Sequence, residues 1–258
     1  MLIKSFYNYI IIQKLYNFIK GKPILMKTII GIVVVILIST IILGISNKYN
    51  ENLKKNPWVL KNTKTGNVPM TIEQDPKKSN SITIQRTQNS GINFTWGTWL
   101  YINDIGKDNN WQHVFHKGSP ERAPLYCPGV WLSGNKNSLR VIINTFNEID
   151  VTLDVDNLPI KKWFHLAIYV SQNSFDVWIN GNMVQSRHLD SPPKQNWGNV
   201  YIAHNGGFNG FISNLRYYAY KLPYYKLENV IKQGPNTSSC IDTGDKPPYF
   251  NKDWWLMQ

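Results

Sequence analysis

Two acidic residues, Glu148 and Asp150, alternate in a run that could form a strand with both carboxyl groups on one face. A retaining glycosidase needs two carboxyl groups about 5–5.5 Å apart, and alternate strand positions provide that separation. A further acid would be needed on the same strand, but Thr152 and Leu153 stand in its place. Asp154 shares the face, yet it lies three pleat steps from Glu148, about 20 Å away. The sequence therefore predicts no catalytic residues, and a glycoside hydrolase is the least favoured function.

Histidine and aspartate residues could also hold a metal ion. His113 and His116 are three residues apart, which in a regular strand points their side chains to opposite faces, so we expect no shared zinc ion. Two oxygen-rich loops could bind calcium, which favours carboxylate and carbonyl oxygens, and ordinary polar turns are the alternative. The candidate calcium ligands are Asp104, Asp108, Asp154 and Asp156. Calcium is the only cofactor that the sequence suggests.

Aromatic side chains in predicted loops or strand ends could stack on a sugar ring. Such rings combine a large apolar face with polar neighbours, as carbohydrate sites require. The candidates are Trp111, Tyr126, Trp131 and Trp197. For each of them, packing within the fold is the alternative interpretation.

The two cysteines, Cys127 and Cys240, are too few for a zinc site or for the disulfide framework of a small domain. They could form one disulfide, closing a loop of about a hundred residues, or remain separate thiols. The redox compartment decides between these states. The sequon that begins at Asn236 is a predicted glycosylation site, whereas the sequon at Asn93 falls within a predicted strand.

The net charge is high but spread thinly along the chain. The 28 basic and 16 acidic residues give a formal charge of +12, and six lysines within residues 1–50 carry half of it. There is no run of five or more basic residues of the kind that tracks a phosphate backbone. We therefore expect no nucleic-acid partner.

Residues 28–45 are uncharged and almost wholly apolar. As a helix they would extend about 27 Å, close to the hydrocarbon thickness of a bilayer, and a lone segment in lipid satisfies its backbone only as a helix. We predict a transmembrane signal-anchor over residues 26–46, with the bilayer as a partner. A cleaved signal peptide is the alternative, but a small-x-small cleavage site is missing and 25 residues precede the segment.

The lysines on either side of this segment predict its orientation. Five lysines precede it without any acid, whereas Lys48, Lys54 and Lys55 follow it and are partly offset by Glu51. This excess predicts a single-pass protein with a cytosolic N-terminus. Residues 1–25, a basic aromatic segment, would lie on the membrane as an interfacial helix or stay a poorly ordered tail.

The rest of the chain has the pattern of an all-β domain. Residues 47–80 are polar and interrupted by proline, which predicts a stalk. Strands are expected at 81–86, 92–102, 113–117, 138–146, 148–154, 163–170, 175–180 and 200–204, with a short helix near 224–232. Many short strands separated by turn signals indicate a sandwich or jelly roll over residues 81–235. Residues 236–258 are expected to form a tail that packs on this domain.

Three motifs follow one another in the expected strands. They are Trp163, His165 and Ala167; the hairpin at residues 178–181; and Phe208, Gly210, Ile212, Leu215 and Arg216. In this order they resemble the laminin-G-like branch of the concanavalin-A-like lectin/glucanase superfamily, over about residues 81–225. The resemblance implies an all-β, concanavalin-A-like jelly-roll sandwich, here preceded by one N-terminal transmembrane helix.

The C-terminal run CIDTGDKPPYFNKDWW and the pairing of an anchor with this domain are similar to membrane-anchored proteins of large nucleocytoplasmic DNA viruses. That resemblance implies a place in a virion membrane. We expect a non-catalytic interaction protein, a structural component that docks other virion or membrane proteins. The alternative is a carbohydrate-binding, lectin-like adhesion protein with glycans as partners.

Overall fold

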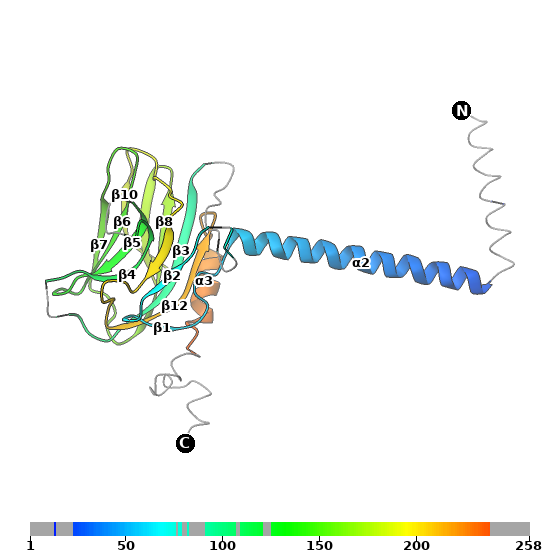
Figure 1. Ribbon diagram of the computed structural model, residues 1–258, viewed down its shortest axis with the longest axis horizontal. Helices are drawn as coiled ribbons and strands as arrows, with labels where there is room; N and C mark the ends of the chain where they lie inside the picture. The colour runs from blue at the N-terminus through cyan, green and yellow to red at the C-terminus, as the bar shows by residue number, and fades with distance from the viewer. Residues whose placement is uncertain are drawn as a thin grey trace, which may run out of the picture. The chain divides into compact units, whose positions relative to one another are not determined.

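The computed structural model describes residue 13 and residues 23–75, 77–78, 82, 91–106, 109–120 and 125–237. The chain divides into two compact units, Met1–Asn52 and Leu53–Gln258. Most of the first unit's described residues belong to one long helix, and two β-sheets with a short helix form the second (Figure 1).

The long helix, α2, runs from Pro23 to Lys55. Within it, Lys27–Asn52 is long and apolar enough to cross a membrane, and its most apolar 18-residue stretch has a mean hydropathy of 3.0. Its two hydroxyl side chains bond back to the helix, from Ser39 Oγ to the Val35 carbonyl oxygen at 2.8 Å and from Thr40 Oγ1 to the Leu37 carbonyl oxygen at 2.8 Å. All its described side chains are exposed, so this helix is no part of a protein core and is a candidate single-pass anchor or signal sequence.

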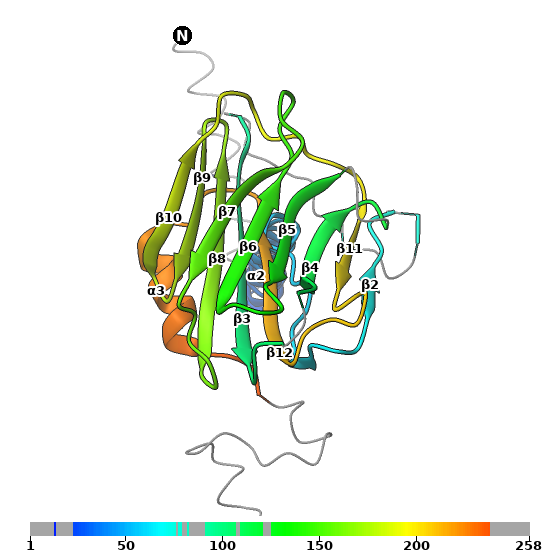
Figure 2. The same ribbon diagram turned by 90° about the vertical axis from the view of Figure 1, so that its left-hand side faces the viewer.

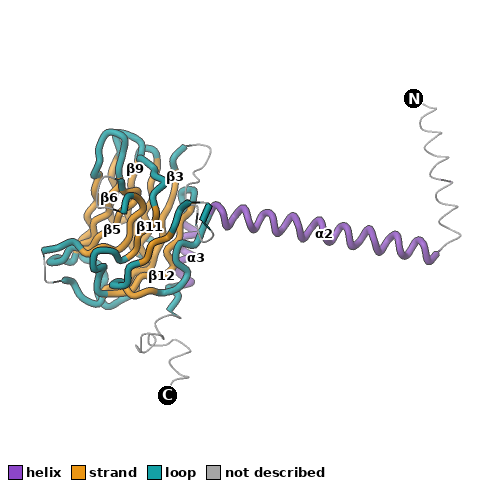
Figure 3. The backbone as a smooth tube through the Cα atoms, in the orientation of Figure 1, coloured by secondary structure: helices purple, strands orange, loops and turns teal. Residues whose placement is uncertain are grey.

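The second unit contains two six-stranded antiparallel sheets packed face to face (Figures 2 and 3). In order across the first sheet lie β1 (Lys64–Thr65), β12 (Gly210–Tyr218), β3 (Asn93–Ile102), β8 (Trp163–Ser171), β9 (Ser174–Ile179) and β10 (Asn182–His188). In order across the second sheet lie β2 (Met70–Ile72), β11 (Asn199–Ile202), β4 (Gln112–Gly118), β5 (Tyr126–Leu132), β6 (Ser138–Ile143) and β7 (Val151–Asp156).

The main core lies between the two sheets, and most strands contribute every second side chain to it. Strand β3 contributes Phe94, Trp96, Leu100 and Ile102, and β8 contributes Phe164, Leu166, Ile168 and Val170. These are the faces that the apolar alternation predicts, because side chains of a strand point alternately to opposite faces. The predicted all-β sandwich is therefore confirmed.

A second, smaller core lies on the outer face of the first sheet, under helix α3 (Tyr224–Gln233). Leu222 and Leu227 pack there against Ala167, Tyr169 and Tyr218. The helix ends at Gly234, whose φ of 72° suits glycine and whose N–H bonds the Ile231 carbonyl oxygen. With α3 in place, this part of the first sheet is closed to ligands.

Most predicted strands correspond to observed ones. The runs at 92–102, 113–117, 138–146, 163–170, 175–180 and 200–204 correspond to β3, β4, β6, β8, β9 and β11, and the predicted helix is α3. The strand predicted at 148–154 begins only at Val151, because the Thr145 N–H donates to the Glu148 carbonyl oxygen at 2.8 Å and closes a turn before it. Apart from residue 82, the strand predicted at 81–86 lies outside the described residues.

The structure gives much of the predicted stalk, residues 47–80, a different role. Residues 47–55 continue helix α2, whereas β1 pairs with β12 and β2 pairs with β11. Trp58 bridges to Arg216, whose guanidinium lies 4.4 Å from the centre of the indole ring, and Val59 is buried in the main core. The polar, proline-interrupted composition after helix α2 reflects two very short edge strands joined by turns. The residues from Trp58 to the end of β2 therefore belong to the sandwich.

Candidate ligand-binding cleft

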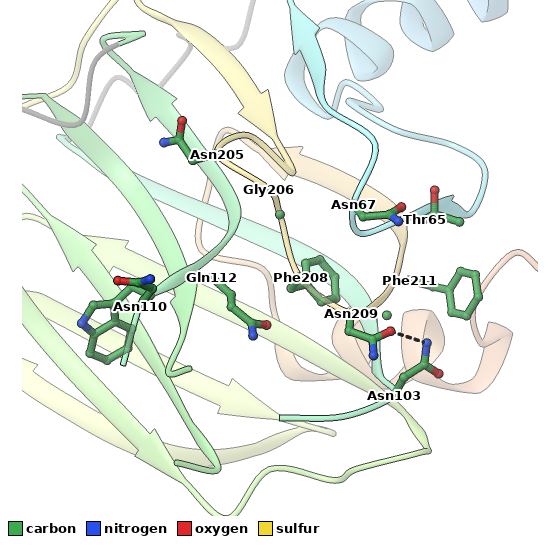
Figure 4. Close-up of a pocket in the computed structure, with 13 residues that line it drawn as sticks. Thr65, Asn67, Asn103, Asn110, Gln112, Asn205, Gly206, Phe208, Asn209 and Phe211 are labelled. Atoms are coloured by element: carbon green, nitrogen blue, oxygen red, sulfur yellow. Dashed lines mark hydrogen bonds between the residues drawn. The ribbon is translucent and has the colours of Figure 1, made fainter. Parts of the chain in front are cut away.

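A cleft of about 410 Å³ opens where three connections between strands meet (Figure 4). They are the turn from β1 to β2, the loop from β3 to β4 and the turn from β11 to β12. Its volume falls within the range of about 300–1,000 Å³ that is typical of small-molecule sites.

Amide side chains dominate the polar lining of this cleft: Asn67, Asn103, Asn110, Gln112, Asn205 and Asn209. Each amide offers both donors and an acceptor. Asn103 Nδ2 already donates to Asn209 Oδ1 at 3.0 Å, which fixes the orientation of both groups (Figure 4). Among the described lining residues there is no Asp, Glu, Lys or Arg. The cleft therefore suits a polar but uncharged ligand.

Three aromatic residues, Trp111, Phe208 and Phe211, also line the cleft. Phe208 is only 2% exposed and supports the cleft from below, whereas Trp111 and Phe211 are half-buried. The guanidinium of Arg140 lies 4.4 Å from the centre of the Trp111 ring, which holds this indole from one side. Trp111 and Phe211 thus supply partly accessible apolar surface beside the amides.

Backbone hydrogen bonds tie the connections around the cleft to one another. The Phe208 N–H donates to the Gly66 carbonyl oxygen at 2.9 Å, and the Gly66 N–H donates to the Gly210 carbonyl oxygen at 2.7 Å. On the other side, the Asn103 N–H donates to the Asn209 carbonyl oxygen at 3.0 Å. These bonds fix the connections relative to one another, which lowers the entropic cost of binding a ligand.

Next to this cleft, His113 and His116 lie together, contrary to the expectation from their spacing. Strand β4 is irregular between His113 and Phe115, so that Val114 and Phe115 both enter the main core. A bulge inserts one extra residue and shifts the alternation, which brings His116 Nδ1 to 2.7 Å from His113 Nε2. The prediction that the two histidine side chains point to opposite faces is wrong for that reason. Among the described residues, no group of three or more His, Cys, Asp or Glu is placed to hold a metal ion.

The four predicted sugar platforms are found in three different places. Trp111 lines the cleft. Tyr126 and Trp131 are each 5% exposed and pack around His116, so neither presents an open ring face. Trp197 is 77% exposed but is not among the cleft residues. Of the four, the structure therefore brings only Trp111 into the cleft.

The carboxylates of the predicted calcium ligands have different surroundings. Asp154 accepts two hydrogen bonds from Arg140, at 2.7 Å to each carboxylate oxygen, so this carboxylate is engaged by a guanidinium. Asp104 and Asp156 are exposed, and Asp108 lies outside the described residues. Calcium binding stays a prediction, and Asp154 would have to leave Arg140 to take part.

The acidic residues considered for catalysis are not arranged as a catalytic pair on one strand. Glu148 lies in the turn before β7 and forms an ion pair with Arg187 at 3.2 Å. Asp150 is exposed just before that strand begins. None of the described residues that line the cleft is acidic.

The remaining predicted sites lie away from the cleft or partly outside the described residues. Cys127 is buried, and burial raises the pKa of its thiol to about 12; Cys240 lies outside the described residues. Asn236 Nδ2, the nitrogen to which a glycan would be attached, donates to the Lys61 carbonyl oxygen at 3.1 Å and to Asn62 Oδ1 at 3.2 Å. Glycosylation there would disturb both bonds.

Sequence reasoning missed most of the cleft. Residues 205–210, Asn-Gly-Gly-Phe-Asn-Gly, were interpreted only as part of a fold motif. A signal was present, because adjacent Asn and Gly residues favour left-handed backbone conformations that turn the chain sharply. Asn205, Gly206 and Gly207 do have φ values of 54°, 86° and 61°. The sequence does not show, however, that this turn meets two other connections.

Comparison with known proteins agrees with the fold. A family model described as the concanavalin A-like lectin/glucanases superfamily matches residues 76–223. No curated protein matches the chain at a significant level.

Among solved structures, the receptor binding domain of botulinum neurotoxin D superposes with a TM-score of 0.50 at 14% identity, covering 70% of this chain and 53% of that one. A second structure, the botulinum neurotoxin serotype D binding domain, gives 0.50 at 16% identity, covering 71% and 52%. The chain thus spans about half the length of these solved domains, and the likeness concerns the fold.

Proposed function

Because the chain belongs to the concanavalin A-like lectin/glucanase superfamily, we propose that its sandwich is a non-catalytic carbohydrate-binding domain that holds a neutral glycan in the amide-lined cleft. The apolar part of helix α2 would anchor this domain to a membrane. Fold alone does not choose a ligand, so the proposal depends on the chemistry of the cleft.

The observation that carries the proposal is the combination of amides and aromatic rings, with no charged side chain among the described lining residues. Sugar hydroxyls both donate and accept hydrogen bonds, and an amide can do both at once. The C–H faces of a sugar ring pack on aromatic surface, which Trp111 and Phe211 provide. An acidic sugar would have to bury its carboxylate without a cationic partner among the described lining residues, which costs free energy. A neutral glycan therefore fits better.

A binding role without catalysis is supported by the placement of the acids. Glycoside hydrolysis needs two carboxyl groups on either side of the scissile bond. The described cleft lining has none, and Glu148 and Asp154 are engaged with Arg187 and Arg140.

The docking of other virion or membrane proteins stays a prediction from the sequence. Trp197 is the most exposed aromatic side chain of the described sandwich and a natural first position to vary in a search for such partners. Its loop is firmly held, because the buried Lys117 Nζ donates to the Asn196 carbonyl oxygen at 2.7 Å and to the Gly198 carbonyl oxygen at 2.8 Å.

A glycan array with the full chain in detergent, with and without calcium, tests the proposal. We expect saturable binding to neutral glycans, weakened about fivefold or more by Trp111→Ala and by Asn110→Ala, since each removes a contact worth about 1 kcal/mol or more. Trp197→Ala is the matched control, because it removes an equally large ring outside the cleft, and it should bind as the wild type does. A blank array from folded protein, or equal losses in all three variants, would contradict a carbohydrate site in this cleft.

A further inference from the structure

A chain of hydrogen bonds runs from the β11–β12 turn through two imidazoles. The His204 backbone N–H donates to His113 Nδ1 at 2.9 Å. His113 Nε2 lies 2.7 Å from His116 Nδ1, and His116 Nε2 lies 2.9 Å from the Ser119 carbonyl oxygen.

The two ends of this chain determine which ring nitrogens carry hydrogen. A backbone N–H can only donate, so His113 Nδ1 is the acceptor, and a carbonyl oxygen can only accept, so His116 Nε2 carries a hydrogen. A neutral imidazole has one donor and one acceptor, so His113 Nε2–H must donate to His116 Nδ1. An additional proton on either ring would place two N–H groups against each other, so the intact chain requires both imidazoles to be neutral.

The surroundings of the pair also oppose a charge. His113 is 2% exposed and His116 5% exposed. The rings of Tyr201 and Trp131 stack on His116 at 4.9 and 6.1 Å, and such faces favour a cation. Burial has a larger effect than these ring faces. Loss of hydration, with a smaller contribution from His204, lowers the pKa of His116 to about 4.

Among the described residues, the titratable groups around the pair come from β11, β5, the β11–β12 turn and the segment after β2. Tyr201 lies on β11 and Tyr126 on β5, and both rings contact His116. His204, from the turn, contacts the ring of His113 at 6.3 Å, and its own Nε2 lies 3.3 Å from the Met70 carbonyl oxygen. Burial raises the pKa of the Tyr201 phenol, and the nearby charge of Glu73, which follows β2, raises it further.

The turn that His113 holds is one side of the ligand cleft. Residues 205–207 line the cleft directly after His204. The turn closes on itself through the Gly207 N–H, which donates to the His204 carbonyl oxygen at 3.0 Å. Gln112, the residue before His113, lines the cleft from β4. His113 therefore joins two elements that both line the cleft.

We propose that His113 and His116 are positioning residues of the cleft, which hold the turn at residues 203–207 while both rings are neutral and release it when the pair takes up a proton. This role rests on the proposed function, because the turn matters to the ligand that the cleft binds. An imidazole freed from the chain of hydrogen bonds takes up a proton below its ordinary pKa near 6.5, so lower pH favours the released turn. Binding is then complete above pH 6.5 and is lost as the pH falls toward 4.

The test follows the turn and the rings in the full chain in detergent, without any ligand. Amide hydrogen exchange of residues 203–210, corrected for intrinsic rates, is measured from pH 7.5 to 4.5, and ¹⁵N spectra identify the imidazole tautomers. We expect neutral Nε2–H tautomers at both histidines at pH 7, and exchange of the turn that rises at least tenfold between pH 6.5 and 4.5.

Glutamine supplies an acceptor and a donor but does not titrate, so the double variant His113→Gln/His116→Gln should make the exchange of the turn independent of pH. His165→Gln is the matched control, since His165 is buried on the outer face of the other sheet, and it should keep the wild-type dependence. A charged or Nδ1–H imidazole at His113 at pH 7 would overturn the proposal even if the variants fail to fold, and so would a turn whose exchange does not change with pH.

Binding to an array of neutral glycans at pH 7.5 and 4.5 separates this proposal from the proposed function. Binding lost at pH 4.5 in the wild type but kept in the double variant His113→Gln/His116→Gln supports both. A blank array at both pH values, together with acid-dependent exchange of the turn, contradicts the carbohydrate function and supports the release of the turn.

Discussion

At the scale of single residues, His165 lies where a charge is unfavourable. It is 2% exposed, contacts Trp99 edge-to-face at 5.4 Å and pairs with it across β3 and β8. In the described structure no hydrogen-bond partner reaches its Nδ1. Burial lowers the pKa of His165 to about 4. The folded state therefore keeps this ring neutral at pH values where an unfolded chain would charge it.

The sign of the resulting acid dependence follows from proton binding. Between pH 6.5 and 4 the unfolded chain binds a proton at His165 and the folded chain does not, so stability is complete above pH 6.5 and falls as the pH is lowered. Each such histidine contributes a slope of about 1.4 kcal/mol per pH unit. Replacing His165 by Leu, an apolar side chain of similar size, should remove its share of the slope.

Guanidinium unfolding followed by tryptophan fluorescence at pH 7.0, 5.5 and 4.5 measures this slope. The wild type and His165→Leu are compared at each pH, and the difference between them should grow in favour of the variant as the pH falls. A constant difference across the three pH values would mean that His165 already takes up its proton in the folded state.

Single residues also show how far sequence reasoning reached. Trp111 was recognised from its residue type and its place in a predicted loop, and it does line the cleft. Tyr126 and Trp131 were chosen in the same way, but β5 was not expected because Pro128 and Gly129 interrupt its run. Both rings consequently pack on the second sheet instead of standing in a loop.

At the scale of elements, the β11–β12 turn depends on two glycines with different surroundings. A Cβ on Gly207 would lie 1.9 Å from the Gly66 carbonyl oxygen, whereas a Cβ on Gly206 would meet nothing within 4 Å. Both residues have positive φ, at 61° and 86°. A side chain at either position would therefore strain the backbone, but only a side chain at residue 207 would collide with the Gly66 carbonyl oxygen.

These two glycines form a matched pair for mutation. Gly206→Ala should cost about 1–2 kcal/mol of stability, the usual penalty for a left-handed non-glycine residue. Gly207→Ala should cost about 1–3 kcal/mol more, because the turn must move away from β1, and it should also open the cleft. Thermal unfolding and amide exchange at residues 66 and 208 distinguish the two effects. Equal losses in both variants would show that the contact with Gly66 does not matter.

Elements were predicted where a strand keeps its alternation and missed where it does not. Strands β3 and β8 follow from their apolar residues at every second position, because both bury one face in the main core. Strand β4 also was expected, but its bulge moves His113 and His116 to the same face, and no feature of the sequence marks the bulge. The cleft was beyond prediction since it joins three connections far apart in the chain.

At the scale of the whole molecule, helix α2 is the candidate membrane anchor of the sandwich. Its segment Lys27–Asn52 meets the length and hydropathy of a membrane span. The hydroxyls of Ser39 and Thr40 bond within the helix, so they add no unsatisfied polar group in lipid. A carbohydrate-binding domain on such a helix would be held at a membrane surface, where several copies could bind one glycan-bearing surface with increased avidity.

We expect the full chain to insert once into microsomes, with the N-terminus outside, on the cytosolic side, and the sandwich in the lumen, because lysines precede the span without acids. With a tag at each terminus, protease should remove the N-terminal tag and leave the C-terminal one. Alkaline carbonate should extract the double variant Leu37→Lys/Ile38→Lys but not the wild type, since each lysine at mid-span costs about 2.5–3.5 kcal/mol. Loss of the N-terminal tag without protease would instead indicate a cleaved signal peptide, and digestion of the C-terminal tag alone would reverse the orientation.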